Sequence, residues 1–189
     1  MGPLVRFILS CCIFLCSTVA LSQQQNWILW SESNPLEWKD FKSRPDSKSK
    51  FSALTSSTFG ISAKAAGNNA VNVRVTSKFI PERSWVKKGK TKDELLRHEQ
   101  LHFDLCEVYA RELRKQMQNK KDWNPKKFNK DFKKMSKRVL KDYMKEQERY
   151  DKETNHSLKK DKQKTWEDET AERLTRLKDY SATLFKIEF

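Results

Sequence analysis

The sequence predicts an α+β fold, in which a β-hairpin or short β-meander precedes a helix with two histidines, and further helices follow. Two observations lead to this expectation. Residues 51–79 alternate between apolar and polar side chains around a turn at Gly67-Asn68-Asn69, which is typical of a half-buried hairpin. After residue 91, apolar residues recur every three or four positions, which is typical of amphipathic helices.

The N-terminal residues 1–22 have the pattern of a secretory signal peptide. A positively charged start precedes an apolar run that begins at Phe7, and Ala20-Leu21-Ser22 provides small residues before Gln23. The apolar run is short for a membrane anchor and polar residues follow it closely, so an uncleaved N-terminal anchor is the less favoured alternative. We therefore expect export to the periplasm or the extracellular space after cleavage at about Ser22/Gln23, which leaves residues 23–189 as a single domain.

The cysteines are consistent with a domain that has no disulfide. Three of the four, Cys11, Cys12 and Cys16, fall in the predicted signal peptide, so only Cys106 remains after cleavage. One cysteine cannot form an internal disulfide, and no second cysteine follows it at the spacing of a metal site. We expect Cys106 to be a small buried residue of its helix.

The chain is strongly basic, with a formal net charge of +14. Most lysines fall on the polar faces of the predicted helices, so a solvated surface accounts for them. The functional alternative is attraction to an anionic envelope surface or to acidic substrates. Nucleic acid is not expected as a partner, because the chain has an export signal and no recognisable binding module. The sequence does not indicate the oligomeric state.

The strands are expected mainly in the N-terminal half. Residues 26–30 are a short apolar strand candidate, and residues 36–41 carry alternating large apolar side chains after a turn. A long hairpin follows, with one strand in residues 51–66 and its partner in residues 71–79. At the other end of the chain, residues 181–189 alternate weakly and predict a terminal strand.

The first helix is expected to start at residues 91–94 and to run to about Met117. Thr91-Lys92-Asp93-Glu94 matches a capping box, and acids in the first turn favour the helix dipole. The residues of its apolar stripe include both histidines. These residues are Leu95, His98, His102, Leu105, Tyr109, Leu113 and Met117. Because the histidines share this stripe, they are expected to face the inside of the domain.

Two more helices are expected downstream. Asn124-Pro125 has the composition of a helix start, and an apolar face then runs from Phe128 to Tyr143. The pattern breaks over residues 149–155, which predicts a loop, and a third helix is expected at about residues 158–180.

The residues that carry chemistry lie on the first of these helices. His98 and His102 are four residues apart, so both imidazoles lie on one face of a helix and can converge on one cation. Glu99 follows the first histidine directly and lies beside that face. This is the HExxH arrangement, in which two histidines bind Zn²⁺ and the glutamate takes a proton from water.

A zinc site needs a third protein ligand, and His156 is the preferred candidate. It is the third histidine of the chain and lies in the predicted loop, where a side chain can be aimed freely. The metzincin continuation is excluded, because Leu105 and Val108 stand where that pattern needs glycine and histidine. Carboxylates remain open as alternatives on spacing alone. They are Glu146, Glu148, Glu153, Glu167, Glu169 and Asp151, whereas Asp104 lies too near on the same helix to reach the metal easily.

Several segments together also match one family pattern. They are residues 95–104, 109–111, 36–41, 84–86 and 150–156, with Gln163 and Trp166. These segments resemble a bacterial family of predicted secreted zinc-dependent proteases that was formerly a domain of unknown function. The family has glycine where this chain has Ser157. The resemblance covers nearly all of the mature chain and implies a zincin-like single domain with His98, His102 and His156 on zinc and Glu99 catalytic.

The expected function is a secreted zinc-dependent metallopeptidase that acts on a peptide or protein substrate. Glu99 would accept a proton from water and pass it to the leaving amine. Asp104 is a candidate hydrogen-bond partner of a ligating histidine, and Tyr150 is a candidate for stabilising the oxyanion. The plainer alternatives for these two are an exposed helix acid and a buried structural tyrosine. The alternative functions are a zinc-stabilised binding module without catalysis and an amidase that acts on cell-wall peptides.

Overall fold

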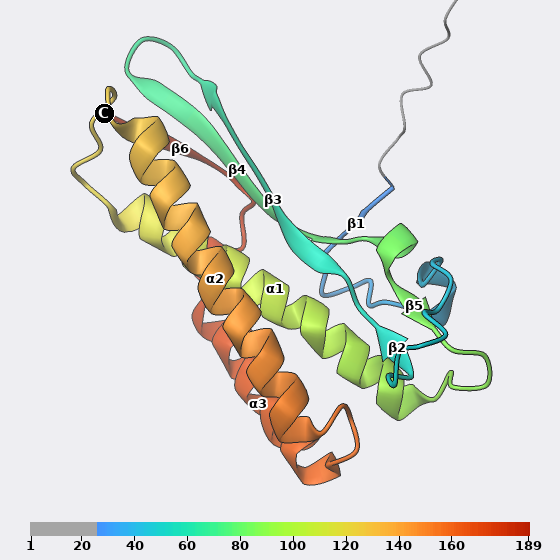
Figure 1. Cartoon of the computed structure of the whole chain (residues 1–189). Coiled ribbons are helices and arrows are strands. Elements are labelled where there is room, and N and C mark those ends of the chain that lie inside the picture. The colour runs from blue at the N-terminus through green and yellow to red at the C-terminus, as the bar shows by residue number, and fades with distance from the viewer. Residues whose placement is uncertain (1–25) are drawn as a thin grey trace, which may run out of the picture.

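The structure is a computed structural model that describes residues 26–189, and the signal peptide expected at residues 1–22 lies outside them. A β-rich N-terminal part is followed by three helices, which confirms the α+β class (Figure 1). The strands are β1 Ile28–Leu29, β2 Ala53–Leu54, β3 Ser57–Ala65, β4 Ala70–Phe79, β5 Trp85–Val86 and β6 Leu184–Glu188. The helices are α1 Asp93–Asn119, α2 Phe128–Thr154 and α3 Lys160–Arg176. The zincin-like fold that the family resemblance implies stays a prediction.

Strand β4 is the centre of the main sheet, and all of its pairings are antiparallel. It pairs with β3 along one edge, from Ser57↔Phe79 to Ala65↔Val71, which confirms the long hairpin. The short strand β1 and the terminal strand β6 share the other edge. Both had been predicted as strands from their sequences. In Figure 1 the three helices pack side by side, and all lie on the same side of the β3–β4 hairpin.

The predicted first hairpin strand is divided in the structure. Residues 53–54 form β2, which pairs with β5 in a separate two-stranded sheet, and β3 begins only at Ser57. The division occurs at Ser56, whose N–H is bound by the Ser84 hydroxyl at 2.9 Å rather than by a strand partner. The alternating pattern did not reveal this break, because residues on both sides of it keep the same period of two.

The prediction of extended chain over residues 36–41 is wrong. Residues Trp38–Asp40 form a 3₁₀ turn that is closed by Glu37 and Asp40. The Glu37 N–H donates to the Asp40 carboxylate at 2.8 Å, and the Asp40 N–H donates to the Glu37 carbonyl at 2.9 Å. This local hydrogen bonding competes successfully with strand formation.

Helix α1 begins at Asp93, inside the segment predicted for its start, but the expected capping box is not formed. The residue at the N-cap is Lys92, whose ammonium group cannot accept a hydrogen bond from the helix N–H groups. The predicted inward stripe is present, since His98, Leu105, Leu113 and Met117 are all buried. The apolar stripe of α1 therefore faces the interior in both halves of the helix.

A buried ionic cluster fixes α1 against β4 and the C-terminal segment. The Arg114 guanidinium is fully buried and donates to both oxygens of Glu107, to the Val75 carbonyl and to the Tyr180 carbonyl. The Ser77 hydroxyl also donates to Glu107 at 2.8 Å. Since each charge has partners, the cluster holds α1 in one orientation on the sheet, as buried hydrogen-bonded pairs do.

Helix α2 differs from its prediction at both ends. It begins at Phe128, because the Asn124 side chain closes a turn on the Lys126 N–H at 2.9 Å instead of capping the helix. It continues to Thr154, so the predicted loop over residues 149–155 is almost entirely helical. Tyr150 and Asp151 therefore lie on a rigid helix. The third helix is shorter than predicted and spans Lys160–Arg176.

The helices of residues 26–189 are too polar to cross a bilayer, since none contains a sufficiently long apolar stretch.

Candidate metal centre

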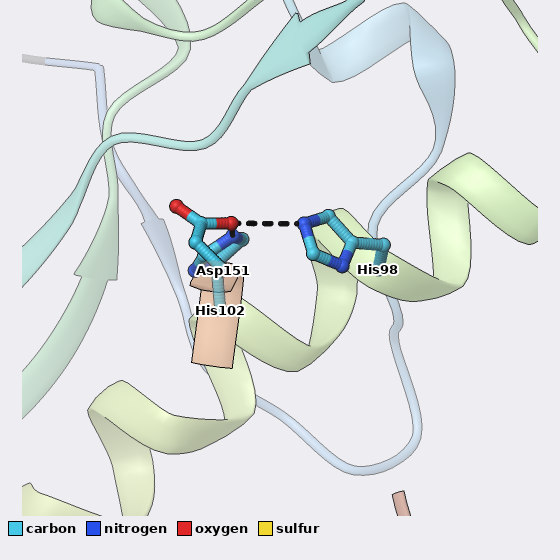
Figure 2. Close-up of side chains that lie close together, drawn as sticks. All are labelled: His98, His102 and Asp151. Atoms are coloured by element: carbon cyan, nitrogen blue, oxygen red, sulfur yellow. Dashed lines mark hydrogen bonds and ion pairs between the residues drawn. The ribbon is translucent and has the colours of Figure 1, made fainter. Parts of the chain in front are cut away.

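The two histidines of α1 converge on one carboxylate of α2. His98 and His102 lie one helical turn apart, and their Nε2 atoms are 3.2 Å and 3.1 Å from Oδ1 of Asp151 (Figure 2). The ligand atoms of these three residues all lie within 4.8 Å of one another. The group His98, His102 and Asp151 can therefore hold a metal ion.

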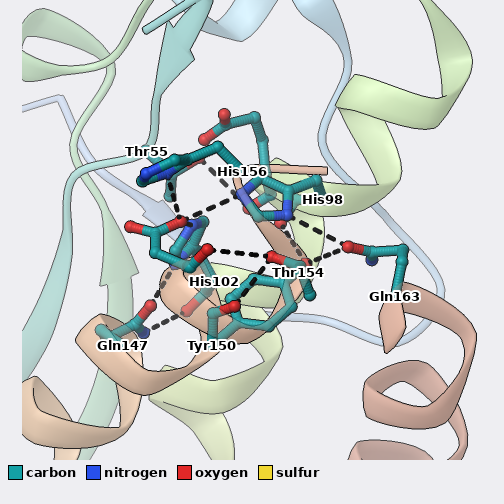
Figure 3. Close-up of polar contacts among 10 residues, drawn as sticks. Thr55, His98, His102, Gln147, Tyr150, Thr154, His156 and Gln163 are labelled. Atoms are coloured by element: carbon teal, nitrogen blue, oxygen red, sulfur yellow. Dashed lines mark hydrogen bonds and ion pairs between the residues drawn. The ribbon is translucent and has the colours of Figure 1, made fainter. Parts of the chain in front are cut away.

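Each histidine has a glutamine on its other ring nitrogen (Figure 3). His98 Nδ1 lies 3.1 Å from Gln163 Oε1 of α3, and His102 Nδ1 contacts Gln147 Oε1 of α2. The amide of Gln147 is oriented by its Nε2, which donates to the His102 carbonyl at 2.8 Å. The Gln163 Nε2 likewise donates to Glu167 at 3.1 Å. Both glutamines therefore present a carbonyl oxygen to the imidazoles.

This arrangement leaves all four imidazole nitrogens facing acceptors. A neutral imidazole donates only one hydrogen bond, and here the Nδ1–H donates to the glutamine. The Nε2 lone pair then points at an anionic carboxylate, which is repulsive unless a cation lies between them. The alternative is two imidazolium ions side by side, with ring centroids 4.8 Å apart, and His98 is only 2% exposed. A metal ion removes this conflict, so the residues present fit one.

Without a metal, the charges of the three residues are strongly coupled. Burial acts to raise the pKa of Asp151, but its hydrogen bonds to His102 and His98 hold the pKa far below its usual range. Burial also acts to lower the pKa of His102, yet the hydrogen bond to Asp151 and the charges of Glu99 and Asp151 raise it above 6.5. Asp151 is consequently ionised at any ordinary pH and available as a ligand.

Glu99 lies on the same helix and faces the same cavity. It is 3% exposed, and its Oε2 is buried without a hydrogen-bond partner. A buried carboxylate oxygen without a partner is costly, and such groups are retained mainly where they have a task. The cavity has a volume of about 1090 Å³ and is also lined by His98, His102 and Asp151. One wall is the segment around β2, where the Thr55 hydroxyl donates to the Glu99 carbonyl at 3.2 Å.

The predicted third ligand, His156, lies next to the site on the loop after α2. Its Nδ1 is 3.3 Å from the same Oδ1 of Asp151, and its ring packs against Phe51 in a tilted arrangement with centroids 4.5 Å apart. The side chain is 39% exposed, far more than either histidine of α1. Residues 155–157 all have positive φ, which is an unfavourable backbone conformation for residues with side chains. This backbone conformation places the His156 ring beside Asp151.

Tyr150 lies behind His98 rather than in the cavity lining. It is fully buried, its ring stacks on His98 at 4.6 Å, and its hydroxyl donates to Gln163 Oε1 at 2.8 Å. Asp104 does not contact the histidine rings. Its carboxylate accepts from Trp30 Nε1 at 2.8 Å and from Gln100 Nε2 at 2.7 Å, which ties the N-terminal segment to α1. Burial raises the pKa of Asp104.

Three residues of the site could not be assigned to it from the sequence. Asp151 was one of several carboxylate alternatives, and Gln163 appeared only within the family resemblance, while Gln147 was not considered. A signal existed in the spacing, because Gln147 and Asp151 are four apart and share a face of a continuous helix. The predicted loop over residues 149–155 concealed that relationship.

The comparisons with known proteins identify a family but no activity. A family described as "Bacterial protein of unknown function (DUF922)" matches residues 37–157, a range that contains both α1 histidines, Glu99, Asp151 and His156. No curated protein and no solved structure matches the chain. The comparison therefore identifies the bacterial family to which the chain belongs, but it does not show a protease activity.

Proposed function

We propose that this chain, which belongs to the bacterial family of unknown function DUF922, is an exported zinc-dependent metallopeptidase in which Glu99 is the general base. The observation that carries the proposal is the position of Glu99. Its buried, unpartnered carboxylate oxygen lies directly beside the three residues that can hold a metal ion, at the wall of an open cavity. A metal site that only stabilises the fold does not require a buried carboxylate oxygen without a hydrogen-bond partner.

Zinc is the metal that suits these donors best. Two imidazoles and one carboxylate form a typical catalytic zinc set, which leaves one position for water or substrate. Bonds of 2.0–2.2 Å place neighbouring ligand atoms of a tetrahedral site about 3.3–3.6 Å apart. The separations of 3.1 Å and 3.2 Å around Asp151 Oδ1 are close to that value and support Asp151 as the third ligand. The prediction that His156 binds the metal stays open to the assays described below.

When bound, zinc supplies a Lewis acid that acidifies water and polarises a carbonyl. The residues of the chain do the rest. Glu99 accepts a proton from the attacking water and returns it to the leaving amine, for which a positioned carboxylate is suited. Gln147 and Gln163 keep the histidines in the tautomer whose Nε2 faces the centre. Tyr150 supports His98 from behind by stacking, in this proposal, rather than stabilising an oxyanion.

The substrate is proposed to be a peptide or protein outside the cytoplasm. The segment around β2 lines the cavity, and β2 pairs with β5 along only one edge. Among residues 26–189 no strand occupies the other edge of β2, so an extended peptide can add to it beside the metal centre.

The direct test compares zinc-loaded wild type with Glu99→Gln on unfolded casein and on purified peptidoglycan. We expect the wild type to cut casein and Glu99→Gln to bind the same amount of zinc while losing hydrolysis by about 10²–10⁴-fold. Release of peptides from peptidoglycan alone would identify an amidase instead. If the wild type binds zinc and cleaves neither material, the metallopeptidase proposal is refuted in favour of a metal-stabilised module.

A further inference from the structure

The cavity beside the metal centre collects exposed apolar side chains. Among residues 26–189, six large apolar side chains are exposed, and three of them line this one cavity. They are Leu54 at 38%, Met144 at 56% and Leu158 at 74% exposure. They come from β2, from α2 and from the loop after α2, so no single amphipathic element explains why they meet.

Exposed aliphatic side chains around a polar centre are typical of a binding surface. Their contact with water is unfavourable by about 25 cal/mol per Å², and folding alone did not bury them. The interior of the domain does not lack apolar residues either, since two clusters of buried residues fill it. Leu54, Met144 and Leu158 are therefore available to a ligand, and a cavity with apolar walls and a few polar groups is the usual form of a ligand site.

The positions of these residues relative to the metal centre suggest how a ligand lies. Met144 precedes Asp151 by seven residues on α2, which places it two helical turns, or about 10 Å, along the axis from the carboxylate. Leu158 follows Asp151 on the loop that carries His156. Met144 and Leu158 therefore flank the Asp151 carboxylate along the chain. About three residues of extended peptide span 10 Å.

We propose that the cavity selects extended peptides with large aliphatic or aromatic side chains near the scissile bond, held by Leu54, Met144 and Leu158. This inference rests on the proposed peptidase function and adds its substrate class. The charged residues that line the cavity include both lysines and glutamates, so their charges do not indicate a preference for acidic or for basic substrates. They are Lys50, Lys90, Lys92, Lys160, Glu94 and Glu148.

Binding to an inactive protein tests the inference without requiring catalysis. The probe is a fluorescent ten-residue peptide with leucines throughout its centre, compared with the same peptide in which serine replaces every leucine. Affinity is measured by anisotropy on zinc-loaded Glu99→Gln. We expect the leucine peptide to bind at least tenfold more tightly, and Leu158→Ser or Met144→Ser to weaken that binding by about tenfold each.

Leu184→Ser is the matched control. Leu184 is 48% exposed on β6 and does not line the cavity, so its replacement removes the same kind of surface elsewhere. Zinc content is measured for every variant, which shows that the centre is intact. Equal affinity for the two peptides, no binding of either, or an equal loss in Leu184→Ser would each overturn the inference. If the leucine peptide binds as expected but wild type does not cut it, the proposed peptidase function fails and the binding preference stands.

Discussion

Replacing Gln147 by methionine tests whether the glutamines hold the metal-binding tautomer. Methionine has nearly the same volume but cannot accept a hydrogen bond from His102 Nδ1. In the structure, Gln147 is half-buried and makes two contacts with His102, one from Oε1 to the ring and one from Nε2 to the carbonyl. The variant therefore leaves the helix intact, while His102 becomes free to rotate or to exchange tautomers.

The expected loss of zinc affinity follows from the kind of contact removed. Groups that hydrogen-bond a ligating histidine typically contribute 10–100-fold to metal affinity, or about 1.4–2.7 kcal/mol. We expect Gln147→Met to fall in this range, since one of the two ligating imidazoles loses its support. The loss of folding stability in the metal-free protein should be smaller, at about 0.5–1.5 kcal/mol, because the site is partly solvated.

The assay is competition for zinc with a chromophoric chelator, with urea unfolding of the metal-free protein measured in parallel. Gln100→Met is the matched control. Gln100 is a half-buried glutamine on α1 with two hydrogen bonds, but these reach Leu36 N and Asp104. Its replacement should lower stability and leave zinc affinity unchanged. Unaltered zinc affinity in Gln147→Met, or an equal decrease in Gln100→Met, would refute the assignment of Gln147 as a positioning residue.

Four further outcomes are expected. Asp151→Asn should lose stoichiometric zinc, measured by elemental analysis after dialysis, and retention of full zinc content would contradict its assignment as third ligand. His156→Ala should keep most of the zinc if Asp151 completes the site, whereas complete loss would establish the histidine as a ligand. In metal-free protein, the raised pKa of His102 stabilises the fold fully below pH 6.5, and this contribution is lost as the pH rises through the folded pKa. Urea unfolding should thus show stability that falls as the pH rises above 6.5, and zinc should remove this trend because it binds neutral imidazole. Because burial raises the pKa of the Cys106 thiol to about 12, iodoacetamide at pH 8 should label the protein only in denaturant. Rapid labelling of the native protein would show that this part of α1 opens.

Local patterns in the sequence predicted much of the fold. Alternation specified the β3–β4 hairpin, and the three-to-four periodicity specified α1 with its histidines on the inward face. Such features depend on residues close together in the chain, so the periodicity of side chains is sufficient to reveal them. The errors occurred where local hydrogen bonds decided the structure, as at the 3₁₀ turn of Trp38–Asp40, or where a helix continued through a polar stretch, as α2 does.

The pair of histidines and Glu99 could be assigned from the sequence, because their spacing alone puts them on adjacent faces of one helix. The partners of this helix could not be assigned in this way. Asp151, Gln147 and Gln163 reach the histidines only because α2 and α3 pack against α1, over sequence separations of 45 to 65 residues. Many carboxylates had a suitable position along the chain, and packing selected one of them. The sequence by itself thus determined the helix that can bind a metal, and the tertiary structure decided which groups from other helices complete and support the site.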